Sequence, residues 1–402
     1  MKKRKKRILL ASDSAEPFNC GVGVAMRANI AAAEHNGDDV IIVAPEHPGT
    51  EECYDVPVIR LPSIRLPARG YRCVFWVTGE YGKKLLIALK WADIVHIHAV
   101  SPLSLLVLWL IRKHGIKVKV ILHLHTQYDE YAKQMAAKYG KFASWLAVKY
   151  ETWFTRKCAS KADMLVCPSA HYAKQLPRYG IIKKAKIWEA PVWFPMCNSS
   201  GSISGDLIKR IRNQNVLVYS GRLAKEKNLV VLFQSFTELC NMQEDFLLIM
   251  IGGGEVDFYR AEADRICGRH AGKIIFLGNQ DRSDLQWIFN SIKERAKRVA
   301  AITLSLTETQ GLALLEQIKC GYPAIVLGNT YLEEIISDGR CGIVVQDDVR
   351  MIAVSIHVFF SWSDDYYMQV SECGSEYIAM RFDSYAAYDR LQDIYENVLV
   401  TG

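Results

Sequence analysis

The stretch from Ala301 to Leu327, AITLSLTETQGLALLEQIKCGYPAIVL, constrains the fold of this chain more than any other. It opens within a short apolar run, Ala300–Leu306, whose length suits a buried strand. A polar break follows, and then an apolar-periodic segment that begins at Leu312 and closes at the helix-stop signal Gly321. A second apolar run, Ala324–Leu327, predicts the next strand. The pattern therefore predicts a strand–loop–helix–strand unit.

Two carboxylates flank the turn of this unit, Glu308 in the loop and Glu316 in the helix. Thr307 or Thr309 is expected to cap the helix start, where unpaired amides and about half a positive charge suit a phosphate. Glu316 lies roughly one and a half turns into the helix, where its oxygens can accept hydrogen bonds from a diol such as ribose. Phosphate between two acceptor carboxylates fits a nucleotide sugar. The competing interpretation is two solvated glutamates around an ordinary helix.

The residues Ser305–Pro323 resemble the donor-site signature of retaining glycosyltransferases of family four, which have the GT-B fold. That signature reads Ser-x-x-Glu-x-x-Gly-Leu-x-x-x-Glu-x-x-x-x-Gly-x-Pro, and every fixed position is present here. The resemblance implies that Glu316 holds the nucleotide ribose and that Glu308 faces the donor sugar. It also places Gly311 and Leu312 at the donor site.

Length and composition indicate a globular protein with two domains. The chain has 402 residues, half of them hydrophobic, and a net charge of +7 that includes six cations in the block Lys2–Arg7. Eleven cysteines without a Cys-x-x-Cys motif or a Cys/His cluster favour reduced thiols and no zinc site. The first apolar run stops at Asp13, too early for a signal peptide, and Pro102–Ile111 is about half the length that spans a bilayer. We therefore expect a cytoplasmic protein.

The beginning of the chain predicts a βαβ unit with a glycine turn. Arg7–Ser12 is expected to form the first strand and Val24–His35 the helix after it, with Gly21 and Gly23 in the turn between them. A dinucleotide fingerprint needs a glycine where Met26 stands, so a dehydrogenase is disfavoured. In the glycosyltransferases that the chain resembles, a glycine-rich loop here approaches the donor phosphate or the acceptor. An ordinary tight turn is the other interpretation.

Two further predicted strands, Ile94–His98 and Val118–His125, end in histidine. Ligands of open α/β sheets bind at the carboxyl ends of strands, so His98, His123 and His125 are candidates, although a structural role is common for such histidines. His125 begins the string HTQYDEY and resembles the histidine with which the family contacts the donor sugar. This string, together with the later ETQGL, resembles the branch that glycosylates diacylglycerol.

The helical stretch Tyr131–Lys161 interleaves basic and aromatic side chains. Its cations are Lys133, Lys138, Lys141, Lys149, Arg156, Lys157 and Lys161, and its aromatic residues include Tyr139, Phe142, Trp145, Tyr150, Trp153 and Phe154. In one interpretation the aromatic residues face the core and the lysines are solvated. In the other the stretch lies on a membrane surface, where each cation near anionic lipid adds about 1 kcal/mol.

The predicted strand Asn215–Ser220 begins a second α/β domain, and a basic loop follows it. In this loop Arg222 offers a fork of donors and Lys227 a point charge, both suited to a diphosphate. The loop is similar to the Gly-Arg-Leu-x-x-x-Lys-Asn donor loop of the family. The basic segment Ser291–Val299 has no explanation in the sequence.

We therefore predict an α/β protein of GT-B fold, in which two Rossmann-like doubly wound domains face a cleft. The expected divisions are an acceptor domain at 1–195, a linker at 196–214, a nucleotide-sugar domain at 215–380 and a C-terminal helix at 381–402. In the family that the chain resembles, this last helix crosses back to the first domain.

The expected activity is retaining transfer of a hexose from a nucleotide sugar, of the UDP type, to a membrane glycerolipid. A soluble or protein-linked glycan is the alternative acceptor. Different activities also stay open: an epimerase or phosphorylase on a similar fold, or a catalytically silent module that binds sugar nucleotide. The expected catalytic residues are His125, Glu308, Arg222 and Lys227, and the expected donor-binding residues are Gly21, Gly23, Arg222, Lys227, Glu308, Gly311, Leu312 and Glu316.

No cofactor or metal is expected, because Arg222 and Lys227 would neutralise the charge that develops on the departing diphosphate. The chain also has no Asp-x-Asp motif of the metal-dependent type. The expected partners are the nucleotide sugar, the lipid or glycan acceptor and an anionic membrane surface, to which the protein would bind peripherally. Nucleic acid is not an expected partner.

Overall fold

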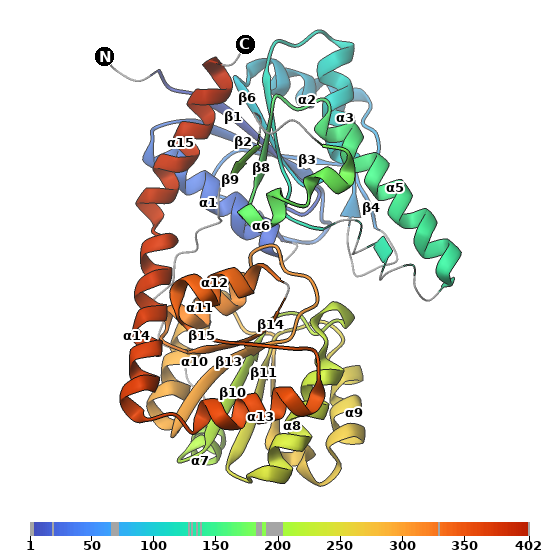
Figure 1. Cartoon of the computed structure of the whole chain (residues 1–402). Helices are drawn as coiled ribbons and strands as arrows, with labels where there is room; N and C mark the ends of the chain where they lie inside the picture. Colours follow the sequence, from blue (N-terminus) through green and yellow to red (C-terminus); the bar gives the residue numbers. More distant parts are fainter. Residues whose placement is uncertain are drawn as a thin grey trace. The chain divides into compact units, whose positions relative to one another are not determined.

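In the computed structural model the chain divides into two compact units, Met1–Phe194 together with Ser384–Gly402, and Pro195–Asp383. Each unit is built on a parallel sheet with helices on both faces (Figure 1). The structure describes residues 4–17, 20–65, 72–127, 129, 132–133, 136, 139–181, 187–189, 204–328 and 330–400.

The first unit contains a seven-stranded sheet in the order β3-β2-β1-β6-β7-β8-β9, with all neighbouring strands parallel. The order reverses at the β1–β6 pair, and doubly wound sheets bind ligands beyond the carboxyl ends of the strands at such a point. The strands are β1 (Arg7–Ala11), β2 (Asp39–Pro45), β3 (Val58–Leu61), β6 (Ile94–His98), β7 (Lys119–His123), β8 (Met164–Cys167) and β9 (Ile187–Glu189), and β4 (Ile64–Arg65) pairs with β5 (Arg72–Cys73) in a separate antiparallel ribbon.

Helices of the first unit pack on the two faces of this sheet (Figure 1). One face is covered by α1 and α15, and the other by α2 and α3, as the two buried clusters show. The helices are α1 (Gly21–His35), α2 (Gly79–Trp91), α3 (Pro102–Lys113), α5 (Lys141–Ala159), α6 (Ala170–Ala173) and α15 (Ser384–Val400).

Successive side chains along the central strands point to opposite faces of the sheet. On β1, Ile8 joins the core under α1 and α15, whereas Leu9 joins the core under α2 and α3. On β6, Ile94 lies on the same face as Ile8. His96 and His98, two and four residues further on, therefore also face α1 and α15.

The second unit contains a six-stranded parallel sheet in the order β12-β11-β10-β13-β14-β15. Its order reverses at the β10–β13 pair, which is the corresponding switch point. The strands are β10 (Asn215–Ser220), β11 (Phe246–Ile251), β12 (Ile274–Gly278), β13 (Arg298–Thr303), β14 (Ala324–Leu327) and β15 (Gly342–Val345).

The helices of the second unit complete a doubly wound fold (Figure 1). They are α7 (Gly205–Ile211), α8 (Leu229–Met242), α9 (Val256–Cys267), α10 (Arg282–Arg295), α11 (Leu312–Lys319), α12 (Tyr331–Gly339), α13 (Val349–Phe360) and α14 (Asp364–Arg381). The prediction of two Rossmann-like α/β domains is confirmed.

Several element boundaries differ from the prediction. The strand predicted at Ala300–Leu306 is β13 and ends at Thr303, because Ser305 and Leu306 turn away to bond the backbone of the loop after β10. The helix predicted at Val24–His35 begins at Gly21.

Parts of three predicted features lie outside the described residues: 196–203 of the linker at 196–214, Tyr131 and Lys138 of the basic–aromatic stretch, and Lys2 with Lys3 of the basic block. Residues 205–211 of the predicted linker form α7. Among the described helices, none combines the length and apolar character needed to cross a bilayer.

Candidate active site

Backbone contacts between two glycine-rich loops fix the segment that carries Arg222. This segment follows β10, and the amide of Leu223 donates to the carbonyl of Gly253 after β11, with an N–O distance of 2.8 Å. A Cβ on Gly252 would lie 2.0 Å from the carbonyl oxygen of Gly221, and Gly252 has a φ of +141°. Only glycine permits this approach, so the loops pack directly against each other.

Arg222 is held by an acidic neighbour four residues on. Its guanidinium pairs with the carboxylate of Glu226, whose side chain is 10% exposed, while that of Arg222 is 41% exposed. The hydroxyl of Tyr219 donates to the carbonyl of Arg222 at 2.8 Å. The arginine is therefore anchored at the carboxyl end of β10 with much of its side chain facing solvent.

Lys227 and Glu308 form an ion pair that joins the loops after β10 and β13. Both side chains are mostly buried, at 19% and 15% exposure. The carbonyl of Glu226 accepts from the amide of Leu306 at 3.0 Å and from Ser305 Oγ at 3.3 Å, which fixes the two loops to each other. The structure thus brings two predicted site residues into contact at the switch point of the sheet.

Helix α11 starts at Leu312 with Gly311 as its N-cap residue, so the prediction that Thr307 or Thr309 caps this helix was wrong. Gly311 has a φ of +72°, and a Cβ there would lie 2.6 Å from Leu332 Cδ2. The positive φ favours glycine, and the missing Cβ leaves room for Leu332 where the chain turns into the helix. The first amides of α11 consequently lie close in sequence to Glu308.

Glu316 is buried on α11 and pairs with Arg282, the first residue of α10. Burial raises the pKa of the Glu316 carboxyl, and the Arg282 guanidinium opposes that rise. Sequence reasoning identified Glu316 but missed Arg282, because a lone arginine at a helix start carries no recognisable spacing. The pair presents an oriented carboxylate, which is the group needed to accept from a diol.

The four charged donor residues predicted in the second unit lie on the segments that follow β10 and β13. Cations such as those of Arg222 and Lys227 suit a diphosphate, as do the backbone amides at a helix N-terminus such as that of α11. The carboxylates of Glu308 and Glu316 are suited to accept from hydroxyl groups. This combination of charges and acceptors suits a nucleotide sugar.

His125 follows β7 in the first unit and is half-buried. Its Nε2 lies 3.0 Å from His98 Nδ1, and its ring stacks on those of His98 and His123 with centroids 5.3 and 3.9 Å apart. Burial lowers the pKa of His125 to about 3. The imidazole is therefore neutral near pH 7.

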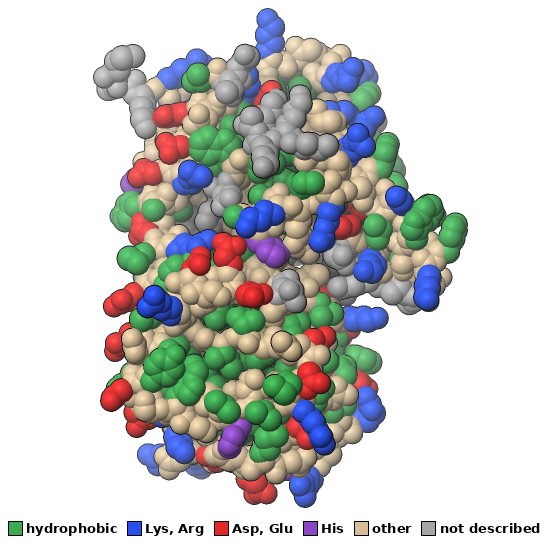
Figure 2. All heavy atoms as spheres, viewed as in Figure 1, with side chains coloured by type: hydrophobic (Ala, Val, Ile, Leu, Met, Phe, Trp, Pro, Cys, Tyr) green, Lys and Arg blue, Asp and Glu red, His purple; other side chains and the backbone are tan. Residues whose placement is uncertain are grey.

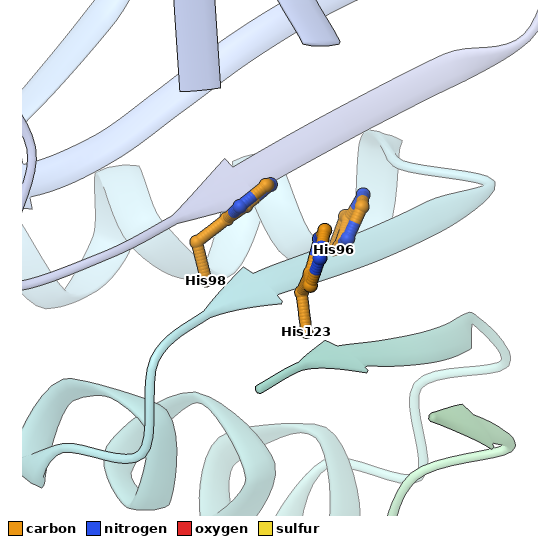
Figure 3. A group of neighbouring side chains, drawn as sticks. All are labelled: His96, His98 and His123. Carbon is orange, nitrogen blue, oxygen red and sulfur yellow. The ribbon is translucent and has the colours of Figure 1, made fainter. Parts of the chain in front are cut away.

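Three buried histidines, His96, His98 and His123, place nitrogen atoms within 4.8 Å of one another (Figure 3). Imidazoles that share a metal ion point a nitrogen at it in the plane of each ring. These rings instead stack, with only 10° between the planes of His96 and His123 and 29° between those of His96 and His98. In this arrangement the cluster is a stack of neutral rings.

Gly21 and Gly23 lie in the first turn of α1, and so the prediction that they form a turn before the helix was wrong. Cys20 is the N-cap residue, and its thiol donates to the carbonyl of Ser14 at 3.4 Å. The two glycines thus contribute amides of a helix N-terminus.

Asp13 is a buried carboxylate at the end of β1 that sequence reasoning did not treat as a site residue. It accepts from the amides of Val74 at 3.2 Å and Leu103 at 3.1 Å. Burial raises its pKa to about 6. These contacts tie the segment after β5 and the first turn of α3 to the end of β1, so the structure supports a scaffolding role.

Comparisons with known proteins agree with this geometry. Residues 20–192 match the family model described as Glycosyltransferase Family 4, and residues 208–362 match the one described as Glycosyl transferases group 1. An alpha-monoglucosyldiacylglycerol synthase of Streptococcus pneumoniae is 25% identical over 346 residues, which cover 84% of this chain and 74% of that protein. The synthase of the same name from Acholeplasma laidlawii is 24% identical over 368 residues, with 88% of each chain covered.

Among solved structures, a sucrose-phosphate synthase from Thermosynechococcus elongatus resembles this chain with a TM-score of 0.71. The match covers 99% of this chain and 100% of that one at 17% identity. At this identity the likeness concerns the fold.

Proposed function

Because this chain belongs to glycosyltransferase family 4 and has the GT-B fold, we propose that it transfers glucose from UDP-glucose to diacylglycerol with retention of configuration. The predicted family and the predicted glycosyltransferase class are confirmed, and the proposal concerns the donor, the stereochemistry and the acceptor. The names of the two synthases related to this chain support glucose, an α-linkage and diacylglycerol.

The proposed donor chemistry follows from charge. Departure of the nucleoside diphosphate leaves negative charge on its phosphate oxygens, and a fixed cation there is worth about 3 kcal/mol of transition-state stabilisation. In this proposal Arg222 and Lys227 neutralise that charge, so the proposed reaction needs no metal ion. Glu316 accepts from the ribose hydroxyls, and Glu308 accepts from the sugar.

In the proposed reaction the bond between the anomeric carbon and the diphosphate oxygen breaks. A bond to the acceptor hydroxyl oxygen forms on the same face of the sugar, which retains the configuration, and the hydroxyl proton passes to the departing diphosphate oxygen. We assign no protein nucleophile. His125 contributes hydrogen bonds to the donor sugar as a neutral ring, consistent with the lowering of its pKa by burial.

The observation that carries the lipid acceptor is an apolar and basic face on α5 (Figure 2). Six large side chains of this region are more than half exposed: Tyr139, Phe142, Trp145, Leu146, Tyr150 and Trp153. Their spacings of three, four and seven residues place those within α5 on one face of the helix. Of the aromatic residues that we considered as core candidates, only Phe154 is buried.

Cations accompany this aromatic face. Lys149 Nζ lies 6.0 Å from the ring centroid of Trp145, and Lys157 Nζ lies 5.9 Å from that of Trp153. Aromatic rings at a membrane interface with lysines beside them are the composition that peripheral helices use on anionic lipid. We therefore propose that α5 holds the protein on the membrane that contains its acceptor.

The basic N-terminus contributes less to this proposal than its sequence suggests. Lys5 pairs with Asp39 at 2.7 Å, and Arg7 pairs with Asp93 at 2.8 Å. These contacts stabilise the start of β1 within the first unit. The proposed membrane contact therefore rests on α5.

The test is a transfer assay with purified protein, UDP-glucose and vesicles of phosphatidylglycerol that contain diacylglycerol. We expect a product with the mass of monoglucosyldiacylglycerol and an α-anomeric proton by NMR, and equal rates with and without EDTA. A β-linked product contradicts retention, and loss of activity in EDTA contradicts the metal-free site. Product formation only with a soluble glycan, screened in parallel, contradicts the lipid acceptor while leaving the enzyme class intact.

A further inference from the structure

A buried amide on α1 connects to His125 through one intermediate histidine. Asn29 Nδ2 lies 3.0 Å from His98 Nε2 and 3.2 Å from His96 Nδ1. On the other side of the same ring, His98 Nδ1 lies 3.0 Å from His125 Nε2. Asn29, His96 and His98 are all buried. These contacts form a continuous chain from α1 to the end of β7.

The polarity of this chain follows from the chemistry of its members. An amide nitrogen carries two protons and accepts no hydrogen bond, so Asn29 donates to both rings. A neutral imidazole has one N–H and one lone pair, and because His98 Nε2 accepts, the proton of His98 resides on Nδ1. His98 then donates to His125 Nε2, which leaves the proton of His125 on Nδ1.

Two further observations agree with neutral rings in this order. The hydroxyl of Tyr395 on α15 lies 3.0 Å from His96 Nδ1, the same nitrogen that Asn29 contacts, which fits an accepting nitrogen there. Burial lowers the pKa of His98 well below its usual range. Each ring therefore keeps a single proton at neutral pH.

We propose that Asn29 is a positioning residue of the transfer reaction, which fixes the proton of His125 on Nδ1 by holding the tautomer of His98. A ring whose plane and tautomer are both fixed presents one pattern of donor and acceptor to a bound sugar. The kinetic part of this inference rests on the proposed function, in which His125 contacts the donor. The tautomer of His125 does not depend on it.

The first measurement is the tautomer of His125 in the full-length protein, read from the ¹⁵N shifts of labelled histidines. We expect a protonated Nδ1 and an unprotonated Nε2. Asn29→Asp keeps the shape of the side chain but offers only acceptor atoms. If His98 stays neutral, which its own ¹⁵N shifts report, it must then donate from Nε2 and accept at Nδ1, so the proton of His125 should move to Nε2.

The matched control is Asn36→Asp, which makes the same change at the end of the same helix, where the amide donates to the carbonyl of Ala32. The control should keep the wild-type tautomer. If Asn29→Asp fails to fold, the wild-type spectrum alone decides the relay, and a wild-type His125 protonated on Nε2 overturns it. A folded Asn29→Asp in which His98 is neutral and the His125 tautomer is unchanged overturns it as well.

Kinetics test the positioning role. Asn29→Asp should lower kcat by about tenfold or more, with the KM for the nucleotide sugar within about twofold, because orientation matters most in the transition state. A switched tautomer with unchanged kcat overturns the positioning role. If the wild-type protein does not transfer glucose to lipid, the proposed function fails, whereas the spectra still decide the relay.

Discussion

At the scale of single residues, the two cations of the donor loop give the sharpest test of the site. Lys227→Ala and Arg222→Ala should each lower the rate of transfer by about a hundredfold, the cost of removing one fixed charge from a developing anion. Lys225→Ala is the matched control. Lys225 is exposed in the same short helix of residues 225–227, and its replacement changes the charge by the same amount. Near-normal turnover of both site variants would show that the diphosphate binds elsewhere.

Stability and charge must be separated for Lys227, because its removal leaves Glu308 mostly buried without its cation. The double variant Lys227→Ala with Glu308→Gln removes both charges. It should regain thermal stability relative to Lys227→Ala, as expected when an uncompensated carboxylate is neutralised. Its activity should stay low, which would show that the rate loss of Lys227→Ala does not come from lost stability.

The two carboxylates should differ in what they bind. Glu316→Gln should weaken binding of free UDP, because it removes a charged acceptor from the ribose. Glu308→Gln should weaken the binding of UDP-glucose more than the binding of UDP. Calorimetry with both ligands measures this difference. Equal losses for both variants on both ligands would contradict the assigned roles.

Arg282 should affect UDP binding through Glu316 and with a characteristic pH dependence. Burial already raises the pKa of Glu316 and Arg282 opposes the rise. Arg282→Ala should therefore raise the pKa of Glu316 further. The variant should bind UDP most weakly at low pH, and its affinity for UDP should increase with pH. Arg295→Ala, at the other end of α10, is the control, and a pH-independent loss would point to a different role for Arg282.

The residues of the proposed donor site stand out in the sequence, whereas the side chains that pair with them do not. Arg222, Lys227, Glu308 and Glu316 follow strands at fixed spacings that resemble a family motif. The contacts that orient them join side chains far apart in the sequence, as in Lys227 with Glu308 and Arg282 with Glu316. Such pairs depend on how strands are ordered in the sheet, which local sequence does not encode.

At the scale of elements, helix α5 should determine membrane binding. The double variant Phe142→Ser with Trp145→Ser removes two exposed rings, each worth about 1.5–3 kcal/mol when buried in an apolar environment. It should abolish flotation with anionic liposomes at high salt, where charge attraction is screened. Met351→Ser with Val358→Ser, two exposed apolar residues on α13, is the matched control and should float normally.

Wild-type protein should float better at low salt than at high salt, because lysines on α5 add attraction that salt weakens. Flotation that is unchanged by the α5 variant would contradict the proposed surface. Absence of flotation in every condition would contradict the membrane proposal itself. Neither outcome would alter the assignment to the family.

Element type was predictable from the sequence, and element boundaries were less so. The basic segment Ser291–Val299, unexplained by sequence, is the end of α10 and the start of β13. Lys293 Nζ donates to the carbonyl of Cys320 at 3.1 Å, just beyond the last turn of α11, and Arg298 donates to the carbonyls of Phe360 and Trp362 at 2.9 and 2.7 Å. These cations satisfy carbonyls after helix ends, a tertiary role that periodicity does not reveal.

At the scale of the whole molecule, the stack of histidines couples the stability of the first unit to pH. Burial lowers the pKa of His96 and His125 to about 3, and that of His98 and His123 well below the usual range. The unfolded chain binds a proton at each histidine near pH 6.5, so acid favours unfolding below that pH. Asp13 acts in the opposite direction, because its raised pKa of about 6 lets the folded chain keep a proton that the unfolded chain releases.

Substitution of one histidine separates its contribution to the pH dependence of stability from those of the other histidines and of Asp13. Neither nitrogen of His123 has a hydrogen-bond partner among the described residues, so no specific bond is lost in His123→Leu. This variant binds one proton fewer on unfolding than the wild type. As the pH is lowered from about 6 to 4, its free energy of unfolding should therefore decrease less steeply than that of the wild type, by about 1.4 kcal/mol per pH unit. Hydrogen exchange of the β6 and β7 amides, corrected for the intrinsic rate at each pH, measures the free energy for this unit. His114→Leu, which changes an exposed histidine, should keep the wild-type slope. Equal slopes for wild type and His123→Leu would mean that His123 is protonated to the same extent in both states, contrary to its burial in the stack.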